Sequence, residues 1–225
     1  MTTLSTRRFA SRAALDAALR QRLGQAIAAP HASAIMLSGG TTPLPAYRAL
    51  AHGPLPHDDR LHILFSDDRY VPSDSEASNF QQSRPLLEAL ALPPESLLRV
   101  RTELPLEEAA ADYGQQLAAL LSSGLHIGLG LLGLGANGHT ASLFNAADLE
   151  RARGHYAIAV QRPDGLSAVS VTPELLATVR EPLFVVAGPD KHDAIRALTS
   201  GDPDLPAWRA VQGCAEVALW VHEGE

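Results

Sequence analysis

The sequence predicts an α/β fold in which a doubly wound, mainly parallel β-sheet carries helices on both faces. Six short apolar runs do not alternate with polar residues, as expected of strands that are buried on both sides. Stretches rich in Ala and Leu at helical spacing lie between these runs. A strand followed by a helix, repeated along the chain, gives right-handed βαβ units and hence a Rossmann-like sheet.

The N-terminal third supplies the first elements of this pattern. A helix is predicted over 11–29, because Ala and Leu continue at helical spacing as far as Ile27. The apolar run 34–37 predicts a buried strand, and Pro43 suits the first turn of the helix that follows it, over 44–51.

The remaining elements continue the alternation to the C-terminus. The other apolar runs predict strands at 61–65, 127–134, 156–160, 183–186 and 217–221. The other helical patterns predict helices at 79–91, 106–121, 173–179 and 190–199. Pro and Gly mark connecting loops at 52–57, 92–94 and 200–206. Because no internal repeat or low-complexity linker interrupts this order, residues 1–225 are expected to form a single domain.

Composition limits the classes of function. With 225 residues, 46% of them hydrophobic, the chain can bury a large core. A net charge of −7 without any basic run argues against nucleic-acid binding. The longest apolar stretch, around 125–134, is broken by glycines and is too short for a membrane span. The lone Cys214 fits a reducing compartment, so a cytoplasmic protein is expected. The Arg- and Ser-rich N-terminus shares its composition with transit peptides, but an ordinary helix is favoured.

Polar, glycine-rich segments follow four of the predicted strands. They are "SGGTTP" (38–43), "SDDRYVP" (66–72), "GLGANGHTAS" (133–142) and "AGPDKHDAI" (187–195). In open α/β sheets, ligands bind outside the carboxyl ends of the strands, where the strand order reverses. The four segments are therefore expected to meet and to form one site.

The first two segments offer groups for an anionic ligand. Gly39 and Gly40 let a ligand approach the backbone closely, and Thr41 adds a hydroxyl at the start of a helix. A tight strand-to-helix turn is an equally good interpretation of this segment. Arg69 could hold a phosphate with two hydrogen bonds while a neighbouring acid such as Asp67 orients it, although a surface ion pair is the commoner fate of such residues.

The last two segments offer a cation and a base. Lys191 is expected in the first turn of a helix, where a cation opposes the helix dipole, so a bound anion would explain it better than a structural role. The third segment fits G-x-G-x-x-G, but it does not open the first βαβ unit, which weakens a dinucleotide interpretation. His139 could instead act as a general base, oriented by Asn137 or Asp67.

Taken together, the four segments resemble the 6-phosphogluconolactonases, which share a superfamily with the glucosamine-6-phosphate deaminases. The resemblance lies in "SGGTTP", "DDRYVPSDSEASNF", "GLGANGHTASLF" and "GPDK", which occur in this order over most of the chain. It implies hydrolysis of 6-phospho-D-glucono-1,5-lactone in the oxidative pentose phosphate pathway, without a metal or another cofactor. It further implies His139 as the base, Asp67 as support, and phosphate or sugar contacts from Gly39, Gly40, Thr41, Arg69 and Lys191.

The chain departs from the family pattern at three positions. Asn137 stands where the family commonly has Asp, and losing that carboxylate could lower the pKa of His139. Asp68 replaces Glu, a small change. Ala168 stands where the family usually has an arginine, and Arg162 is the candidate to replace it from another direction.

Three alternatives remain open at this point: an aminosugar-phosphate deaminase or isomerase, a non-catalytic sugar-phosphate binding protein, and a nucleotide-binding module. Ser142 lacks the G-x-S-x-G setting of a nucleophilic serine. The expected partner is a small sugar-phosphate lactone, with no nucleic acid and no membrane, bound to a monomer or a small homo-oligomer.

Overall fold

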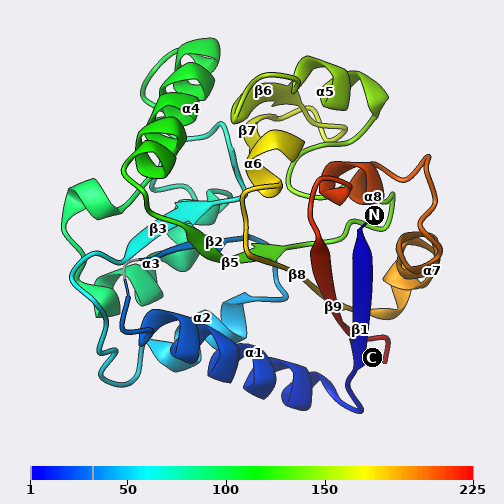
Figure 1. The fold of residues 1–225 in the computed structure, drawn as a ribbon, viewed down its shortest axis with the longest axis horizontal. Helices are drawn as coiled ribbons and strands as arrows, with labels where there is room; N and C mark the ends of the chain where they lie inside the picture. The colour runs from blue at the N-terminus through cyan, green and yellow to red at the C-terminus, as the bar shows by residue number, and fades with distance from the viewer. Residues whose placement is uncertain (1, 32, 225) are drawn as a thin grey trace.

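Six parallel strands form the central sheet of the computed structural model, which describes residues 2–31 and 33–224 (Figure 1). Their order across the sheet is β1-β9-β8-β5-β2-β3. Their bounds are β1 (Thr3–Arg8), β2 (Ala34–Leu37), β3 (His62–Phe65), β5 (Ile127–Leu132), β8 (Glu181–Ala187) and β9 (Glu216–His222). The predicted α/β class with a mainly parallel sheet is confirmed.

Helices cover both faces of this sheet, as predicted (Figure 1). One face carries α1 (Arg12–Ile27), α2 (Leu44–Leu50) and α3 (Asn79–Leu90). The other carries α4 (Leu106–Ser122), α5 (Ala146–Arg151), α6 (Pro173–Leu176), α7 (His192–Ser200) and α8 (Pro206–Val211). Within the described residues, no helix has the length and apolarity of a membrane span.

Alternation along the strands explains how each face gets its own core. On β2, Ile35 and Leu37 pack into the cluster beneath α1 to α3, whereas Met36 packs into the cluster on the opposite face. On β8, Val185 and Val186 are divided in the same way. The continuous apolar runs therefore report burial on both sides of the sheet.

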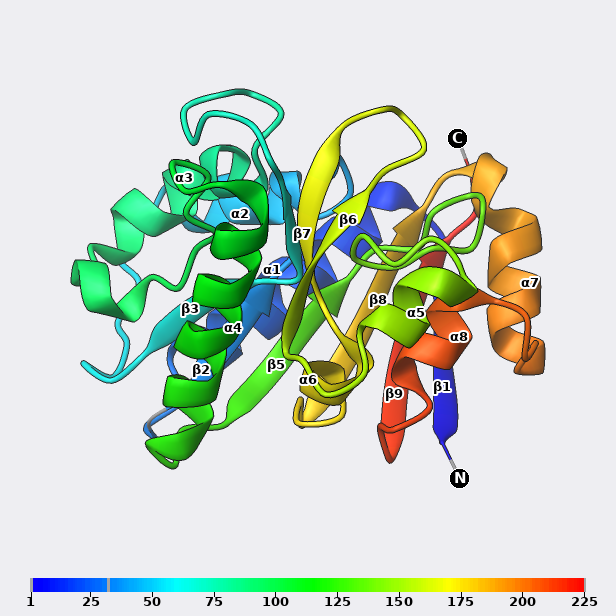
Figure 2. The ribbon, with the colours of Figure 1, turned by 90° about the horizontal axis from the view of Figure 1, so that it is seen from above.

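A second, antiparallel sheet lies on the same face as α4 (Figures 1 and 2). It contains β4 (Asp67–Arg69), β7 (Ser167–Val171) and β6 (Ala157–Gln161), in that order. The assignment of 156–160 to the parallel sheet is therefore wrong. Both faces of β6 are buried, since α4 packs on it, and a doubly buried strand shows the same apolar run in either kind of sheet.

Several short elements did not show in the sequence pattern. The strand β1 lies at the sheet edge and is mostly exposed, so its polar residues carry no apolar signal. The helices α5 and α8 have six residues each, which is too short for a clear helical period. Boundaries also differ, since β5 ends at Leu132 and α6 ends at Leu176.

The strand order reverses between β2 and β5. From β2 the chain continues outwards to β3, whereas from β5 it continues in the other direction to β8 and β9. The segments that follow β2 and β5 therefore flank the crevice at which such sheets bind ligands.

Candidate active site

A cavity of about 340 Å³ opens at this reversal and is lined by all four of the polar segments. The predicted site residues that line it are Gly39, Gly40, Thr41, Asp67, Arg69, His139, Arg162 and Lys191. Asn137 does not line the cavity but contacts His139. The fold thus brings together residues that lie far apart in the sequence, and their chemical roles remain predictions.

The first segment, 38–43, packs against side chains of α3. Gly40 has a φ of +88°, which favours glycine, and its backbone N–H donates to Gln82 Oε1 at 3.3 Å. A Cβ on Gly39 would lie 1.8 Å from Asn79 Oδ1. The structure therefore requires a glycine at position 39 to make room for a protein side chain, a different reason from the predicted approach of a ligand.

Asp67 is a buried carboxylate that lines the cavity. Its Oδ1 accepts from Ser66 Oγ at 2.9 Å and from Asn79 Nδ2 at 3.3 Å, and its Oδ2 accepts from Ser142 Oγ at 2.7 Å. Three neutral donors thus satisfy both oxygens, which allows the carboxylate to be buried.

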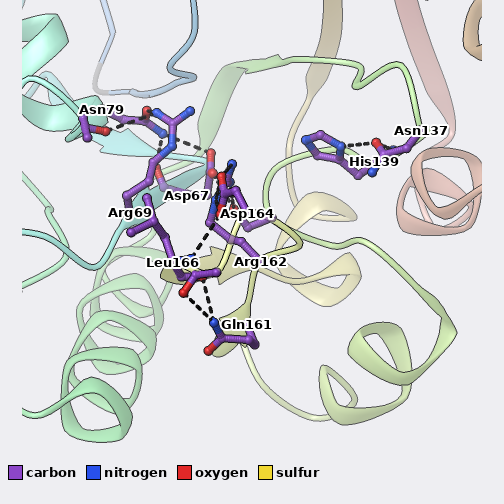
Figure 3. Close-up of polar contacts among 12 residues, drawn as sticks. Asp67, Arg69, Asn79, Asn137, His139, Gln161, Arg162, Asp164 and Leu166 are labelled. Atoms are coloured by element: carbon purple, nitrogen blue, oxygen red, sulfur yellow. Dashed lines mark hydrogen bonds and ion pairs between the residues drawn. The ribbon is translucent and has the colours of Figure 1, made fainter.

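Arg69 is not oriented by an acid, so that expectation is wrong. Its Nη1 donates to Asn79 Oδ1 and to the carbonyl of Ala77, the latter at 3.3 Å (Figure 3). Asp68 is occupied elsewhere, since it accepts from the Asn79 N–H at 2.6 Å. Among residues 2–31 and 33–224 no carboxylate forms an ion pair with Arg69, so its charge is left for an anion.

The turn that carries His139 depends on its glycines. A Cβ on Gly135 would lie 2.1 Å from His139 Nδ1, and one on Gly138 would lie 2.3 Å from Leu205 Cδ1. Gly138 also has a φ of +80°. These contacts explain Gly135 and Gly138, the second and third glycines of the G-x-G-x-x-G pattern, by the packing of a histidine turn, whereas a Cβ on Gly133 would meet nothing within 4 Å.

The imidazole of His139 is held as a neutral group. Asn137 Oδ1 contacts its Nδ1, so the tautomer with a proton on Nδ1 leaves Nε2 as the basic nitrogen (Figure 3). Burial lowers the pKa of His139 to about 4; Asp67 raises that pKa, whereas Arg162 and the other two cations of the cavity lower it further. The ring also packs on Phe144, with centroids 4.5 Å apart. His139 can therefore accept a proton at neutral pH.

Arg162 reaches the cavity from the end of β6 (Figure 3). Its Nη2 lies 2.8 Å from Asp164 Oδ2, and its Nη1 donates to Ser142 Oγ at 3.2 Å. Ala168 is fully buried on β7, where it pairs with Arg69 of the neighbouring strand. Arg162 thus lines the cavity, whereas Ala168 does not, and a replacement of the family arginine by Arg162 stays a prediction.

Lys191 is the only lysine in the sequence, beside 17 arginines. It lies in a short 3-10 turn (Pro189–Lys191) just before α7, and its Nζ is 2.9 Å from Asp190 Oδ2. The predicted conflict with the helix dipole is therefore relieved in part by Asp190.

The sequence argument missed Asn79, which lines the cavity and contacts both Asp67 and Arg69. Its signal was present in "DDRYVPSDSEASNF", but the hydrogen bonds of an amide cannot be read from a motif. In the described part of the chain, no group of three or more His, Cys, Asp or Glu side chains is arranged to hold a metal ion.

Comparison with known sequences places this geometry in context. Residues 7–220 match the sequence model of a family described as glucosamine-6-phosphate isomerases/6-phosphogluconolactonase. The 6-phosphogluconolactonase of Thermotoga maritima is 34% identical over 178 residues, which are 77% of each chain. That of Treponema pallidum is 37% identical over 185 residues, which are 77% of this chain and 76% of the relative.

Solved structures show the same fold. The 6-phosphogluconolactonase from Thermotoga maritima superposes with a TM-score of 0.80 at 28% identity, over 98% of this chain and 99% of that one. A monomeric glucosamine-6-phosphate deaminase superposes with a TM-score of 0.79 over 96% of each chain. At 18% identity, the second likeness concerns the fold alone.

Proposed function

Since the chain belongs to the glucosamine-6-phosphate isomerase/6-phosphogluconolactonase family and is a lactonase-type hydrolase, we propose that it hydrolyses 6-phospho-D-glucono-1,5-lactone to 6-phospho-D-gluconate, a step of the oxidative pentose phosphate pathway. One observation carries the choice of substrate. A neutral imidazole and three cations from separate segments, Arg69, Arg162 and Lys191, line the same cavity. Such a cavity suits a ligand with a reactive carbonyl at one end and a phosphate at the other.

In the proposed reaction, His139 activates water. Its Nε2 takes a proton as the water oxygen bonds to C1 of the lactone, which gives a tetrahedral oxyanion. The C1–O5 bond then breaks, and the imidazolium returns the proton to O5. The products are the open-chain acid and the neutral imidazole, so no covalent enzyme intermediate is needed.

The cations serve the far end of the substrate in this proposal. A phosphate held by Arg69, Lys191 and Arg162 is remote from C1, so its binding energy positions the carbonyl against the water instead of taking part in bond changes. Arg69 is the best suited of the three, because its acceptors in the protein are neutral.

A coupled assay with 6-phosphogluconate dehydrogenase tests the proposal, with the spontaneous hydrolysis of the lactone subtracted. We expect His139→Ala to lower kcat by about 10²–10⁴-fold, the usual contribution of a positioned base. We expect Lys191→Ala and Arg162→Ala each to raise KM by about tenfold or more, because each loses a charge-assisted contact. Arg153→Ala, in an exposed pair on the surface, is the control. Near-wild-type turnover by His139→Ala would exclude this histidine as the base.

The single lysine permits a second test that needs no turnover. Acylation by an amine-specific reagent reports on Lys191 and the N-terminus alone. We expect 6-phosphogluconate to slow the labelling of Lys191 and to leave the N-terminus unaffected; equal labelling with and without it would place the phosphate elsewhere.

The deaminase alternative is supported by the likeness of fold and by the family model, whose description names both activities, whereas the curated relatives reported above are 6-phosphogluconolactonases. It predicts release of ammonia from glucosamine 6-phosphate. Release at a rate comparable to lactone hydrolysis would replace the present proposal.

A further inference from the structure

The start of α3, whose first residue Asn79 lines the cavity, is held by two capping side chains. Ser78 Oγ accepts from the Gln81 N–H at 3.3 Å and so caps the helix. Asp68 accepts from the N–H groups of Asn79 at 2.6 Å and Phe80 at 3.2 Å. Because these acceptors already serve the first turn, the side chain of Asn79 is free to make contacts outside its own helix.

Asn79 uses both ends of its amide on two oppositely charged neighbours. Its side chain is buried, and its Nδ2 donates to Asp67 at the backbone oxygen (2.8 Å) and at Oδ1 (3.3 Å). Its Oδ1 accepts from Arg69 Nη1 (Figure 3). A side-chain amide is neutral and can donate to a carboxylate through its nitrogen while its oxygen accepts from a guanidinium.

The two neighbours are placed to pair with one another. Asp67 and Arg69 are two residues apart on β4, so their side chains project to the same side of the strand. Asn79 lies against both of them, and Gly39 packs so closely on its amide that a Cβ there would lie 1.8 Å from Oδ1. The close packing holds the amide in the orientation that serves both charges.

We propose that Asn79 is a positioning residue that separates Arg69 from Asp67, and so keeps the Arg69 guanidinium available for an anionic group of the substrate. The inference rests on the proposed function, since the anion is taken to be the phosphate of the lactone. It explains why a buried carboxylate and an arginine on one strand do not form an ion pair.

The isosteric variant Asn79→Asp replaces the neutral amide between Arg69 and Asp67 by a carboxylate without changing the shape of the side chain. The new carboxylate would pair with Arg69 and would face Asp67 with like charge. We expect KM for the lactone, and the inhibition constant of inorganic phosphate, each to rise by about tenfold or more, as for the loss of one charge-assisted contact. We expect kcat to change little, because His139 is not touched. If Asn79 served stability alone, the folded variant would show the KM and the kcat of the wild type.

Two further variants complete the design. Asn145→Asp makes the same chemical change at the exposed N-cap of α5 and is expected to leave both constants unchanged. Asn79→Ala removes the amide without adding a charge, lets Arg69 pair with Asp67, and is expected to raise both constants as well. It decides the question if Asn79→Asp fails to fold by circular dichroism. Assays at about pH 7.5 keep Asp68 ionised, since burial raises its pKa to about 6.

Binding of inorganic phosphate separates this inference from the proposed function. Wild-type protein without lactonase activity would overturn the function. Inorganic phosphate held by Arg69 would still protect Lys191 from acylation, because both side chains line the same cavity. Protection in wild type that is lost in Asn79→Asp supports the inference. Unchanged KM, inhibition constant and protection in the Asn79 variants would overturn it.

Discussion

At the residue scale, His139 of the candidate site contacts the amide of Asn137, where the family commonly has a carboxylate. An amide contributes no negative charge to balance an imidazolium, so burial dominates and lowers the pKa of His139 to about 4. Asp67 is the carboxylate whose charge acts against this shift, and three cations act in its favour. The imidazole, which is the proposed base, should therefore stay unprotonated in mildly acidic solution.

This setting makes a prediction for the variant Asn137→Asp. A carboxylate at Nδ1 stabilises the imidazolium, so the pKa of His139 rises. Because the base must be unprotonated to act, the acidic limb of the kcat/KM profile should move from near pH 4 towards higher pH, by about 1–2 units. The limb is measured in the coupled assay with a fixed amount of lactone.

The same substitution at Asn145 provides the comparison, because this side chain caps α5 and makes no hydrogen bond to the imidazole. Its profile should coincide with that of the wild type. An acidic limb that is the same in Asn137→Asp and in the wild type would mean that Asn137 does not govern the charge of His139.

The sequence could name the residues of the cavity better than it could name their contacts. Arg69 and His139 were placed correctly at the sheet edge, because the residue type and the position after a strand are both visible in one dimension. The partner of Arg69 was not predicted, since Asn79 contacts it from the start of a helix ten residues further along the chain. Gly39 shows the same limit, as its requirement comes from the side chain that packs on it.

At the element scale, α3 links its own stability to the geometry of the site. Its first turn carries Asn79 and, one turn later, Gln82, which accepts from the Gly40 N–H. Its last residue is followed by Ala91 in the left-handed conformation, with φ 49° and ψ 36°. A side chain is strained there, and no contact of the site depends on it.

The variant Ala91→Gly should therefore stabilise the protein. Relief of the left-handed strain is worth about 1–2 kcal/mol, and the greater freedom of glycine in the unfolded chain offsets about 0.4–1 kcal/mol of it. We expect the free energy of unfolding in urea to rise by about 0.5–1 kcal/mol. Activity should be unchanged.

The opposite change at a comparable position gives the control. Gly124 follows α4, has a φ of +82° and has open space where a Cβ would lie. Gly124→Ala should lower the free energy of unfolding by about 0.5–1 kcal/mol, since the left-handed strain that it adds exceeds the gain from a less flexible unfolded chain. Destabilisation by Ala91→Gly would show that the helix end is held by other forces.

Strands differed in how far the sequence could assign them. The inner strands of the parallel sheet were recognisable because successive residues are buried on both faces, as in β2 and β8, whereas the exposed edge strand β1 was not. The strand β6 is buried in the same way within an antiparallel sheet, so its apolar run could not reveal its partners. Pairing direction depends on the connection between strands, and the connection from β6 to β7 is a short turn.

At the scale of the whole molecule, charge is distributed unevenly. The chain carries a net charge of −7, yet its cavity is lined by Arg69, Arg162 and Lys191. Local cations can bind an anion in an acidic protein, because low-dielectric walls focus their field. Composition alone therefore could not indicate a site for a small phosphate ester.

Two buried clusters share one sheet, and this arrangement bears on the proposal that residues 1–225 form a single domain. The clusters lie on opposite faces, but successive residues of the same strand contribute to both of them. Loss of either cluster would expose one apolar face of each central strand to water and so destabilise the strands that the other cluster packs on. We therefore expect both clusters to unfold together.

The two tryptophans of the chain permit a direct test of this expectation. Trp208 of α8 packs against one cluster, and Trp220 of β9 packs against the other. In Trp208→Phe the remaining fluorescence reports on the face of α1 to α3, and in Trp220→Phe it reports on the opposite face. For each variant, the urea midpoint from fluorescence should equal the midpoint from far-ultraviolet circular dichroism, as in a two-state transition. Comparison within one variant removes the effect of the substitution itself on stability. Midpoints that separate in either variant would mean that one face of the sheet can lose its helices while the other keeps them, and the chain would then consist of two cooperative units.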